Sequence, residues 1–313
     1  MMRLLFAILL LALPAHGQEW RPEGAITLVS PYSPGGSDAF MRAIGEYMGR
    51  QLGVPVAVVN RDGGSGVVGM RFMASSNPDG RTIAMTPMTA VVVQPHMVRN
   101  LGLDPSHVAP VCGTNENHLG IVVRSDSPIR NLADLLAAGR ARNLSYGSAG
   151  PNSLPMLGVW RVSRATGVEF THIAFRGDPP HLNETLAGRL DFSTAVVASA
   201  SEFVLSDRMR LITVFSAGRH PDFPNVPTAR EQGVDALQFS QVGIYAPRGT
   251  PEHILNRLET LCREALEQEP VRRMAATARS IIRYMPRADF AAMINSEFEA
   301  YRGILQALGV QPE

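Results

Sequence analysis

Short runs of β-branched and other apolar residues alternate with amphipathic stretches through most of the chain. Strands are predicted at Ile26–Val29, Val54–Val59 and Thr82–Met85, and helices at about 39–52 and 67–75. Strand–helix–strand units of this kind form parallel sheets with right-handed crossovers, and their loops gather at the carboxyl edge of the sheet. The first part of the chain therefore predicts a βαβαβ unit.

A second alternating region begins near Leu119 and favours another α/β unit. Its predicted strands cover residues 119–123, 144–147, 169–175, 190–195 and 210–215, and its predicted helices cover 132–138 and 153–166. The chain then has a predicted strand at 242–245 and helices at 252–267 and 287–308. Because only short connections join the two regions, we predict an α/β protein of two lobes with a hinge between them.

The first residues have the pattern of a secretory signal peptide. Arg3 supplies the positive charge, Leu4–Leu13 form the apolar segment, and Ala15 and Gly17 stand at the −3 and −1 positions of a cleavage site. This segment is too short for a permanent membrane helix, and no later stretch reaches the ~18–20 uninterrupted apolar residues that a membrane span needs. We therefore expect residues 1–17 to be removed and the product to be periplasmic.

All 29 residues in the lysine-plus-arginine total are arginines. The absence of lysine from the sequence excludes a Schiff-base lysine, a Ser–Lys dyad and a phosphate-binding P-loop. The 28 acidic residues leave a net charge of +1, which argues against nucleic acid as a partner. A bound anion would therefore be held by backbone amides, hydroxyls and waters, with arginine at most assisting.

A glycine-rich segment at Gly64–Gly69 (GSGVVG) matches the fingerprint of dinucleotide-binding sites. It follows the second predicted strand instead of the first, and no clear acidic residue ends the next strand to hold a ribose. A structural turn is the favoured interpretation, and no nicotinamide or flavin cofactor is expected.

Catalytic and metal-binding patterns are weak in this sequence. Ser148 follows Gly147, but Tyr146 occupies the first glycine position of a GxSxG motif, and the eight histidines have no metal-ligand spacing. His172 lies in a predicted strand and is interpreted as packed or hydrogen-bonded, whereas His118 fits a packed or a surface position equally well. We expect no catalytic residue, no metal and no cofactor.

Cys112 and Cys262 are the only cysteines, and the sequence does not say whether they pair. Two buried free thiols are favoured over a single disulfide, which remains the alternative.

Four polar, glycine- or proline-containing loops follow predicted strands and lead toward helices. They cover residues 32–38, 86–89, 147–153 and 176–179. The exposed N–H groups at a helix start attract anions without any basic side chain. One such loop is ordinary turn chemistry, but four of them at strand ends in both regions favour a ligand-binding cleft between the lobes.

Eight segments, taken in order, resemble one known family. The segments are Ile26–Arg42 (ITLVSPYSPGGSDAFMR), Val58–Gly69 (VVNRDGGSGVVG), Asn77–Thr82 (NPDGRT), Tyr146–Ser153 (YGSAGPNS), Phe175–Pro180 (FRGDPP), Gly188–Asp191 (GRLD), Val226–Gly233 (VPTAREQG) and Ala246–Pro251 (APRGTP). Together they are similar to the substrate-binding receptors of tripartite tricarboxylate transporters, the Bug-type extracytoplasmic solute-binding proteins. Each segment alone is weak, but the ordered set covers nearly the whole mature chain.

The resemblance implies a type II-like periplasmic binding fold that closes on a small organic acid. It implies one lobe of residues 18–121 plus 242–313 and a second lobe of residues 122–241. In the family, one carboxylate is held by the loops that match 33–38 and 175–179, partly through ordered water, and the loop that matches 147–153 contacts the other end of the ligand. The implied ligand-binding residues are Tyr32, Ser33, Gly35, Gly36, Ser37, Asp38, Thr86, Thr89, Ser148, Ala149, Gly150, Ser153, Phe175, Arg176, Gly177, Asp178 and Ala195.

Several residues depart from the family pattern or leave their role open. The first loop is one residue short, so Asp38 is either displaced or a helix cap. Arg176 is either a carboxylate clamp or a solvent-facing arginine. Pro151 and Asn152 replace a pair that usually contains glycine. The apolar residues Ala195, Val196 and Val197 stand where the family often has a polar or acidic residue, and they predict a less polar ligand end, such as an aromatic or aliphatic tail.

The sequence therefore predicts a periplasmic solute-binding protein that captures a carboxylate-bearing molecule and does no chemistry on it. Its expected partners are the small acid and the membrane permease subunits of a tripartite transporter, and the protein is expected to be a monomer. The alternatives are a ligand sensor for a two-component system and an exported hydrolase or isomerase on an α/β scaffold.

Overall fold

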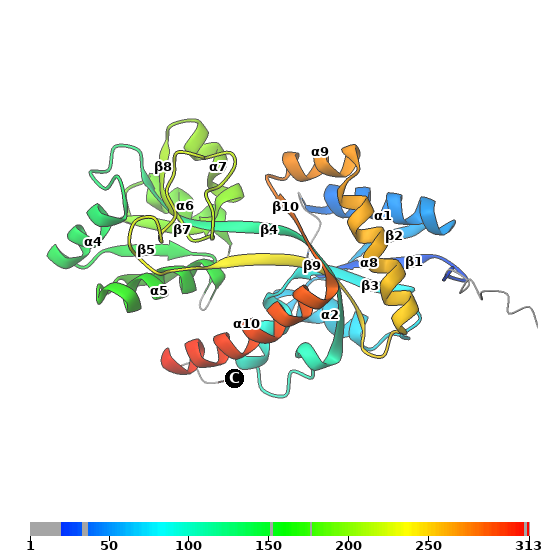
Figure 1. Ribbon diagram of the computed structural model, residues 1–313. Helices are drawn as coiled ribbons and strands as arrows, with labels where there is room; N and C mark the ends of the chain where they lie inside the picture. Colours follow the sequence, from blue (N-terminus) through cyan, green and yellow to red (C-terminus); the bar gives the residue numbers. More distant parts are fainter. Residues whose placement is uncertain (1–19, 33–36, 151–152, 176, 310–311, 313) are drawn as a thin grey trace, which may run out of the picture.

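The computed structural model describes residues 20–32, 37–150, 153–175, 177–309 and 312 (Figure 1). The expected signal peptide lies outside these residues. So do four residues of the expected ligand site, Ser33, Gly35, Gly36 and Arg176, and two residues of the third loop, Pro151 and Asn152.

In the described part of the chain, ten strands form one curled sheet. Their order is β2-β1-β3-β9-β4-β7-β5-β6, and β8 and β10 also pair with β4. The strands are β1 (Ile26–Ser30), β2 (Val56–Asn60), β3 (Thr82–Pro87), β4 (Val108–Arg124), β5 (Ser145–Ser148), β6 (Thr171–Ala174), β7 (Phe192–Val196), β8 (Met209–Val214), β9 (Phe239–Pro247) and β10 (Ile281–Met285). Strands β1, β2 and β3 pair in parallel, as do β5, β6 and β7, whereas β4 and β9 are antiparallel to their neighbours. The predicted βαβαβ unit is confirmed.

Helices cover both faces of each half of the sheet, so the prediction of two α/β lobes is also confirmed (Figure 1). The first lobe carries α1 (Ser37–Leu52), α2 (Val67–Ala74), α3 (Thr89–Val92), α8 (Glu252–Leu266), α9 (Glu269–Thr277) and α10 (Arg287–Ala307). The second lobe carries α4 (Leu132–Ala141), α5 (Leu154–Thr166), α6 (Asp178–Leu186) and α7 (Val197–Leu205). None of the helices in the described ranges is long and apolar enough to cross a membrane.

Successive residues of a strand point to opposite faces of the sheet, so the hydrophobic core is divided between these two faces. In β9, Ile244 packs with α1 and α8 on one face, and the next residue, Tyr245, packs against Phe290 of α10 on the other. In the second lobe, Val122 of β4 and Leu182 of α6 belong to a separate hydrophobic cluster. Helices on both faces therefore hold the strand ends at defined positions.

Two long strands, β4 and β9, connect the lobes (Figure 1). Strand β4 pairs with β9 and β10 on the side of the first lobe and with β7 and β8 on the side of the second. The sequence predicted only the last part of β4. Pro110 and a polar run at 114–118 hide the alternation of apolar and polar residues in the earlier part, where the pairing with β9 also has two register irregularities. The lobe boundaries near 121 and 242 fall inside these strands and stay a prediction.

The favoured interpretation of two free thiols is wrong. Cys112 of β4 and Cys262 of α8 form a disulfide, and their Cα atoms lie 6.7 Å apart. Both residues are fully buried in the cluster between the sheet and α8. The pairing depends on which face of α8 lies against β4, and the spacing of the two cysteines in the sequence carries no information about that.

The glycine-rich segment forms the tight turn that joins β2 to α2. Gly66, at the start of α2, has a φ of +92°, which favours glycine, and a Cβ at Gly69 would stand 2.7 Å from the Arg61 carbonyl and 2.8 Å from Pro31 Cα. Both glycines are therefore explained by the backbone conformation and by the close contact of α2 with the end of β1.

His118, for which a surface position was an open alternative, is buried inside β4. Its Nδ1 lies 2.9 Å from Ser216 Oγ, and its Nε2 lies 3.3 Å from Glu116 Oε1. The ring of His220 packs edge-on against it with 5.3 Å between centroids, and His220 Nδ1 accepts a hydrogen bond from the Asp222 N–H. A pair of buried imidazoles therefore lies where the two lobes join.

The buried His220 predicts a loss of stability in weak acid. Desolvation, followed by electrostatic repulsion from His118 and Arg279, lowers the pKa of His220 to about 4, while Asp222 opposes the shift. The unfolded chain takes up this proton first as the pH falls below about 6.5, so the stability due to neutral His220 is complete above that value and is lost progressively down to about pH 4. We expect the free energy of unfolding to fall by about 2 to 3 kcal/mol from this group alone. Urea unfolding at pH 7 and 4.5 should give a smaller difference for His220→Gln than for the unaltered protein, and equal differences would contradict the assignment.

Candidate functional site

A cavity of about 270 Å³ lies at the carboxyl ends of β1 and β3, between the two lobes. The first lobe contributes the start of α1 and the ends of its strands to the cavity wall, and the second lobe contributes the start of α7. The connecting strands β4 and β9 complete the wall. The lining residues are Ser30, Tyr32, Phe40, Met41, Met85, Thr86, Pro87, Asn115, Asn117, Val196, Ala198, Val242, Ala278 and Ser280. Ligands of open α/β sheets bind at this edge, and the volume suits a small molecule.

The polar lining of this cavity is uncharged. Hydroxyls come from Ser30, Tyr32, Thr86 and Ser280, and carboxamides come from two asparagines of β4. Among the described lining residues there is no aspartate, glutamate, lysine, arginine or histidine. The rest of the wall is apolar, so the cavity can hydrogen-bond a polar group at its ends and pack against a hydrocarbon segment between them.

Thr86 is the most informative residue of the wall. It lies in β3 and is 1% exposed, and its Oγ1 makes no hydrogen bond of normal geometry to a described residue. Burial raises the pKa of Tyr32, and a contact with the Thr86 hydroxyl opposes part of that rise, so the Tyr32 hydroxyl is the neighbouring polar group. A buried polar atom without a partner costs roughly 1–3 kcal/mol, and native proteins rarely leave one in place without a role. Because this hydroxyl belongs to a cavity-lining residue, a bound ligand can supply the missing partner.

Tyr32 and Asp38 lie on either side of the start of α1. Tyr32 lines the cavity mouth, and its ring lies over the Gly66 turn. Asp38 is buried in the first turn of α1, where its carboxylate accepts a hydrogen bond from Asn60 Nδ2 at 3.2 Å. The same Nδ2 donates to the Tyr32 carbonyl at 3.0 Å. Asp38 therefore ties α1 to the end of β2, and Ser37 begins the same helix.

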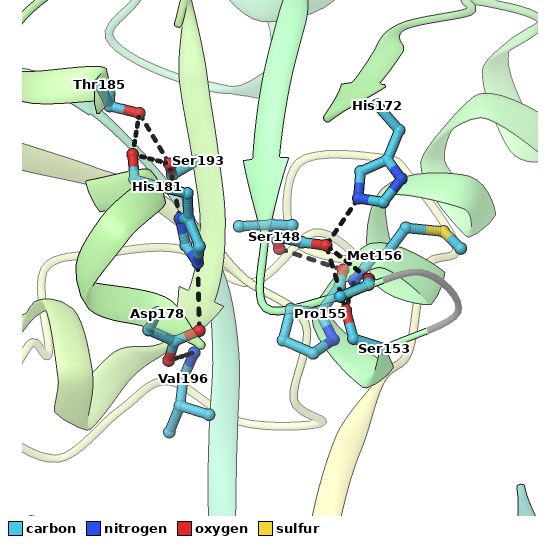
Figure 2. Close-up of polar contacts among 12 residues, drawn as sticks. Ser148, Ser153, Pro155, Met156, His172, Asp178, His181, Thr185, Ser193 and Val196 are labelled. Carbon is cyan, nitrogen blue, oxygen red and sulfur yellow. Dashed lines mark hydrogen bonds and ion pairs between the residues drawn. The ribbon is translucent and has the colours of Figure 1, made fainter. Parts of the chain in front are cut away.

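The side chain of Ser148 is engaged within the second lobe. Its Oγ lies 2.7 Å from His172 Nε2 and 3.1 Å from Ser153 Oγ, as Figure 2 shows. Ser148 is fully buried, and Ser153 accepts a hydrogen bond from the Met156 N–H as the N-cap of α5. These hydroxyls therefore stabilise the turn between β5 and α5. The hydrogen-bonded interpretation of His172 is confirmed, and burial lowers the pKa of its imidazole, which favours the neutral ring.

Asp178 begins a second buried chain of polar contacts. Its Oδ1 lies 3.2 Å from His181 Nε2, and His181 Nδ1 lies 2.9 Å from Ser193 Oγ, which lies 2.7 Å from Thr185 Oγ1 (Figure 2). The other carboxylate oxygen of Asp178 accepts a hydrogen bond from the N–H of Val196, a residue of the cavity wall. Asp178 therefore positions the wall from behind.

This order of carboxylate, imidazole and hydroxyl is that of a hydrolase triad. A nucleophile has to reach a substrate, however, and both His181 and Ser193 are completely buried. Ser148 of the other serine–histidine contact is also completely buried. Both groups are better explained as supports of the fold. No cluster of three metal-ligating side chains occurs within the described ranges.

The remaining predicted site residues lie near these groups but do not line the described cavity. Gly177 precedes α6 with a φ of +86°, Phe175 donates its N–H to the Ser148 carbonyl, and Thr89 begins α3. Ala149 and Gly150 form the turn after β5. Ala195 packs in the cluster of Val122 and Leu182, because successive strand residues point to opposite faces, and the neighbouring Val196 faces the cavity instead.

Most of the apolar wall was missed by sequence reasoning, as were the asparagines of β4 and the segment before β10. Phe40 and Met41 belong to a helix whose amphipathic pattern indicated only core packing. The alternation Asn115-Glu116-Asn117-His118 was a detectable signal, because it places two carboxamides on one face of a strand.

A larger and more open hollow of about 670 Å³ lies beside β10. Helices α8 and α9 and the segment 220–222 border it, and Ser280 belongs to both walls. Arg279 pairs there with Asp222 at 3.4 Å and with Glu202 at 3.0 Å. The described residues of the predicted ligand site do not line this hollow, so the cavity between the lobes is the candidate site.

Comparison with known proteins identifies the family and the fold. The sequence model of the tripartite tricarboxylate transporter family receptor matches residues 40–310. A UPF0065 protein from the gbd 5′ region of Cupriavidus necator is 30% identical, with 97% of this chain and 94% of that protein aligned. The structure is similar to a TctC solute-binding protein from Polaromonas, with a TM-score of 0.82, 26% identity and coverage of 91% and 99% of the two chains. It is also similar to a protein of R. palustris solved with adipate, with a TM-score of 0.78, 24% identity and coverage of 93% and 99%. The chain therefore belongs to the receptor family of the tripartite tricarboxylate transporters.

Proposed function

We propose that the cavity between the lobes captures a small organic acid and that the protein delivers this acid, chemically unchanged, to the permease subunits of a tripartite transporter. The observation that carries the proposal is the buried Thr86 hydroxyl, which makes no hydrogen bond of normal geometry to a described residue and lies in an uncharged, hydrogen-bonding wall. A carboxylate oxygen accepts a hydrogen bond from such a hydroxyl and from N–H groups at the start of α1, which have no acceptor within the helix itself.

The apolar part of the wall supports an acid with a hydrocarbon segment. Phe40, Met41 and Met85 line the cavity on the side of the first lobe, and Val196 and Ala198 line it on the side of the second. The R. palustris neighbour was solved with adipate, a diacid whose carboxylates are joined by methylene groups. An acid of this kind would place its methylene groups between the two lobes.

Capture would be coupled to closure of the lobes about β4 and β9. A ligand held by residues of both lobes favours the closed arrangement, which presents a joint surface to the permease. In this proposal residues 1–17 are removed on export, and the receptor works in the periplasm as a monomer. Turnover has no part in it, because the serine–histidine groups of the second lobe are buried supports.

A thermal-shift screen tests the function. We expect at least one acid in a panel of mono-, di- and tricarboxylates, aromatic acids and amino acids to raise the unfolding temperature. Binding stabilises the folded state by about 2.7 kcal/mol at one hundred times the dissociation constant. Calorimetry should confirm the hit, and the recovered ligand should be unchanged by mass. A panel without any shift would contradict acid capture, and a transformed ligand would contradict the receptor role.

Replacing Thr86 with valine should separate binding from folding. Valine has the shape of threonine and removes the unpartnered hydroxyl, so the ligand-free protein should keep or gain stability. The acid should lose a hydrogen bond to its carboxylate and bind about 10-fold more weakly. Calorimetry and urea unfolding of the same preparation measure both effects. A destabilised variant with unchanged affinity would give Thr86 a structural role only.

A further inference from the structure

A chain of side-chain hydrogen bonds runs from the core to the cavity between the lobes. It begins at Thr114, passes through Asn115 and Ser280, and ends at Asn117. The residues come from two segments far apart in the sequence, since Thr114, Asn115 and Asn117 belong to β4 and Ser280 immediately precedes β10. All except Thr114 line the cavity.

The direction of this chain follows from its first member. The hydroxyl of Thr114, which is fully buried, donates to Asn115 Oδ1 at 2.9 Å, and its other acceptor, the Val242 carbonyl, is farther away at 3.3 Å. Because Asn115 Oδ1 is the acceptor, its Nδ2 faces Ser280 and donates to Ser280 Oγ at 3.2 Å. The serine proton then goes to Asn117 Oδ1, 3.4 Å away.

The last member is left with its donor group available. Asn117 uses its Oδ1 to accept from Ser280, and no described residue accepts a hydrogen bond from its Nδ2. Strand alternation sends Glu116 and His118 to the opposite face, where they pair with each other, so neither supplies an acceptor. Asn117 is partly exposed and belongs to the cavity wall. An amide N–H₂ group held in this way can only donate hydrogen bonds, so it binds a hydrogen-bond acceptor on the ligand.

We propose that Asn117 selects the second polar group of the ligand and restricts the receptor to acids with a second hydrogen-bond acceptor. This inference rests on the proposed function, in which Thr86 and the start of α1 hold the first carboxylate. It names α,ω-dicarboxylates as the substrate class and excludes ω-amino acids. An ammonium group would meet the N–H₂ of Asn117 and no carboxylate among the described lining residues. Ser280 is a positioning residue, because it holds the Asn117 carboxamide in this orientation.

Calorimetry with matched ligands tests the selection. Dicarboxylates of four to eight carbons are compared with the monocarboxylates and ω-amino acids of the same lengths. For the unaltered protein we expect the best dicarboxylate to bind at least about 10-fold more tightly than both of its analogues. In Asn117→Asp, which keeps the acceptor for Ser280 and replaces the donors with a carboxylate oxygen, the dicarboxylate should lose about 10- to 100-fold and the ω-amino acid should gain.

Two variants of Ser280, together with Thr86→Val, separate this role from general damage to the cavity. Ser280→Ala should lower the ratio of dicarboxylate to monocarboxylate affinity, and Ser280→Thr, which retains the hydroxyl, should restore it. Thr86→Val should weaken both acids by a similar factor and leave that ratio unchanged. If no acid of the panel binds the unaltered protein, the proposed function fails. If acids bind but the ratio is the same in Asn117→Asp, or if ω-amino acids bind the unaltered protein best, the role of Asn117 is overturned and acid capture stands.

Discussion

Replacing Ala198 with tryptophan is expected to abolish acid binding. Ala198 lies in the first turn of α7 and lines the cavity between the lobes, which has a volume of only about 270 Å³. An indole and an organic acid cannot share that space. The affinity should fall by at least about 1,000-fold, which corresponds to ~4 kcal/mol of binding free energy. Calorimetry with the best acid of the panel measures the loss.

The neighbouring residue provides a matched control. Ser199 lies on the same turn of α7 but is exposed and does not line the cavity. Ser199→Trp adds the same side chain to the same helix and should bind with nearly unchanged affinity. Both variants should unfold at similar temperatures, because position 198 is only partly buried. A folded Ala198→Trp variant with full affinity would place the ligand elsewhere, with the hollow beside β10 as the next candidate.

Removing the disulfide should produce the largest loss of stability. Cys112 and Cys262 close a long loop between the central strand β4 and α8. Cross-linking of this kind stabilises by about 2–4 kcal/mol, and the chain-entropy model gives about 4–5 kcal/mol for loops of 100 residues or more. The double variant Cys112→Ala, Cys262→Ala should lose that amount in urea unfolding at pH 7. A reducing agent should lower the stability of the unaltered protein and leave the double variant unchanged. Equal stability of the two proteins without a reducing agent would refute the prediction.

The α/β architecture was predictable because its signals are local. Strands β1, β2 and β3 have short apolar runs bounded by turn residues, and α5, α8 and α10 have long amphipathic patterns. The elements that sequence reasoning missed lack these signals. Helices α7 and α9 have nine residues each and β10 has five, so few repeats of their period are present.

The candidate site was predictable only in part. Tyr32 and Thr86 follow or end strands of the first unit, and strand order alone brings their positions to one edge of the sheet. Ser148 and Asp178 were chosen for their polar groups, which the fold uses internally. A sequence does not show whether a hydroxyl or a carboxylate is already hydrogen-bonded to its own lobe, because that depends on distant residues such as His172 and Val196.

The asparagines of β4 illustrate the same limit in the opposite direction. Their alternation was visible, but their significance depends on Ser280, which lies more than one hundred residues away and reaches them only through the pairing of β10 with β4. The apolar end of the cavity was predicted at Ala195, Val196 and Val197, and the pleat of β7 turns only Val196 of the three toward the cavity. Val196 and Ala198 therefore supply apolar wall beside the hydrocarbon segment of the ligand, and the less polar ligand end stays a prediction.

A crystal structure of the protein with the tightest-binding acid of the panel tests the central claim most directly. We predict the acid in the cavity between the lobes, with one carboxylate oxygen within hydrogen-bonding distance, about 2.5–3.0 Å, of Thr86 Oγ1. The methylene groups should contact Met85 and Val196. An acid bound in the hollow beside β10, or a cavity ligand that leaves the Thr86 hydroxyl without a partner, would contradict the account.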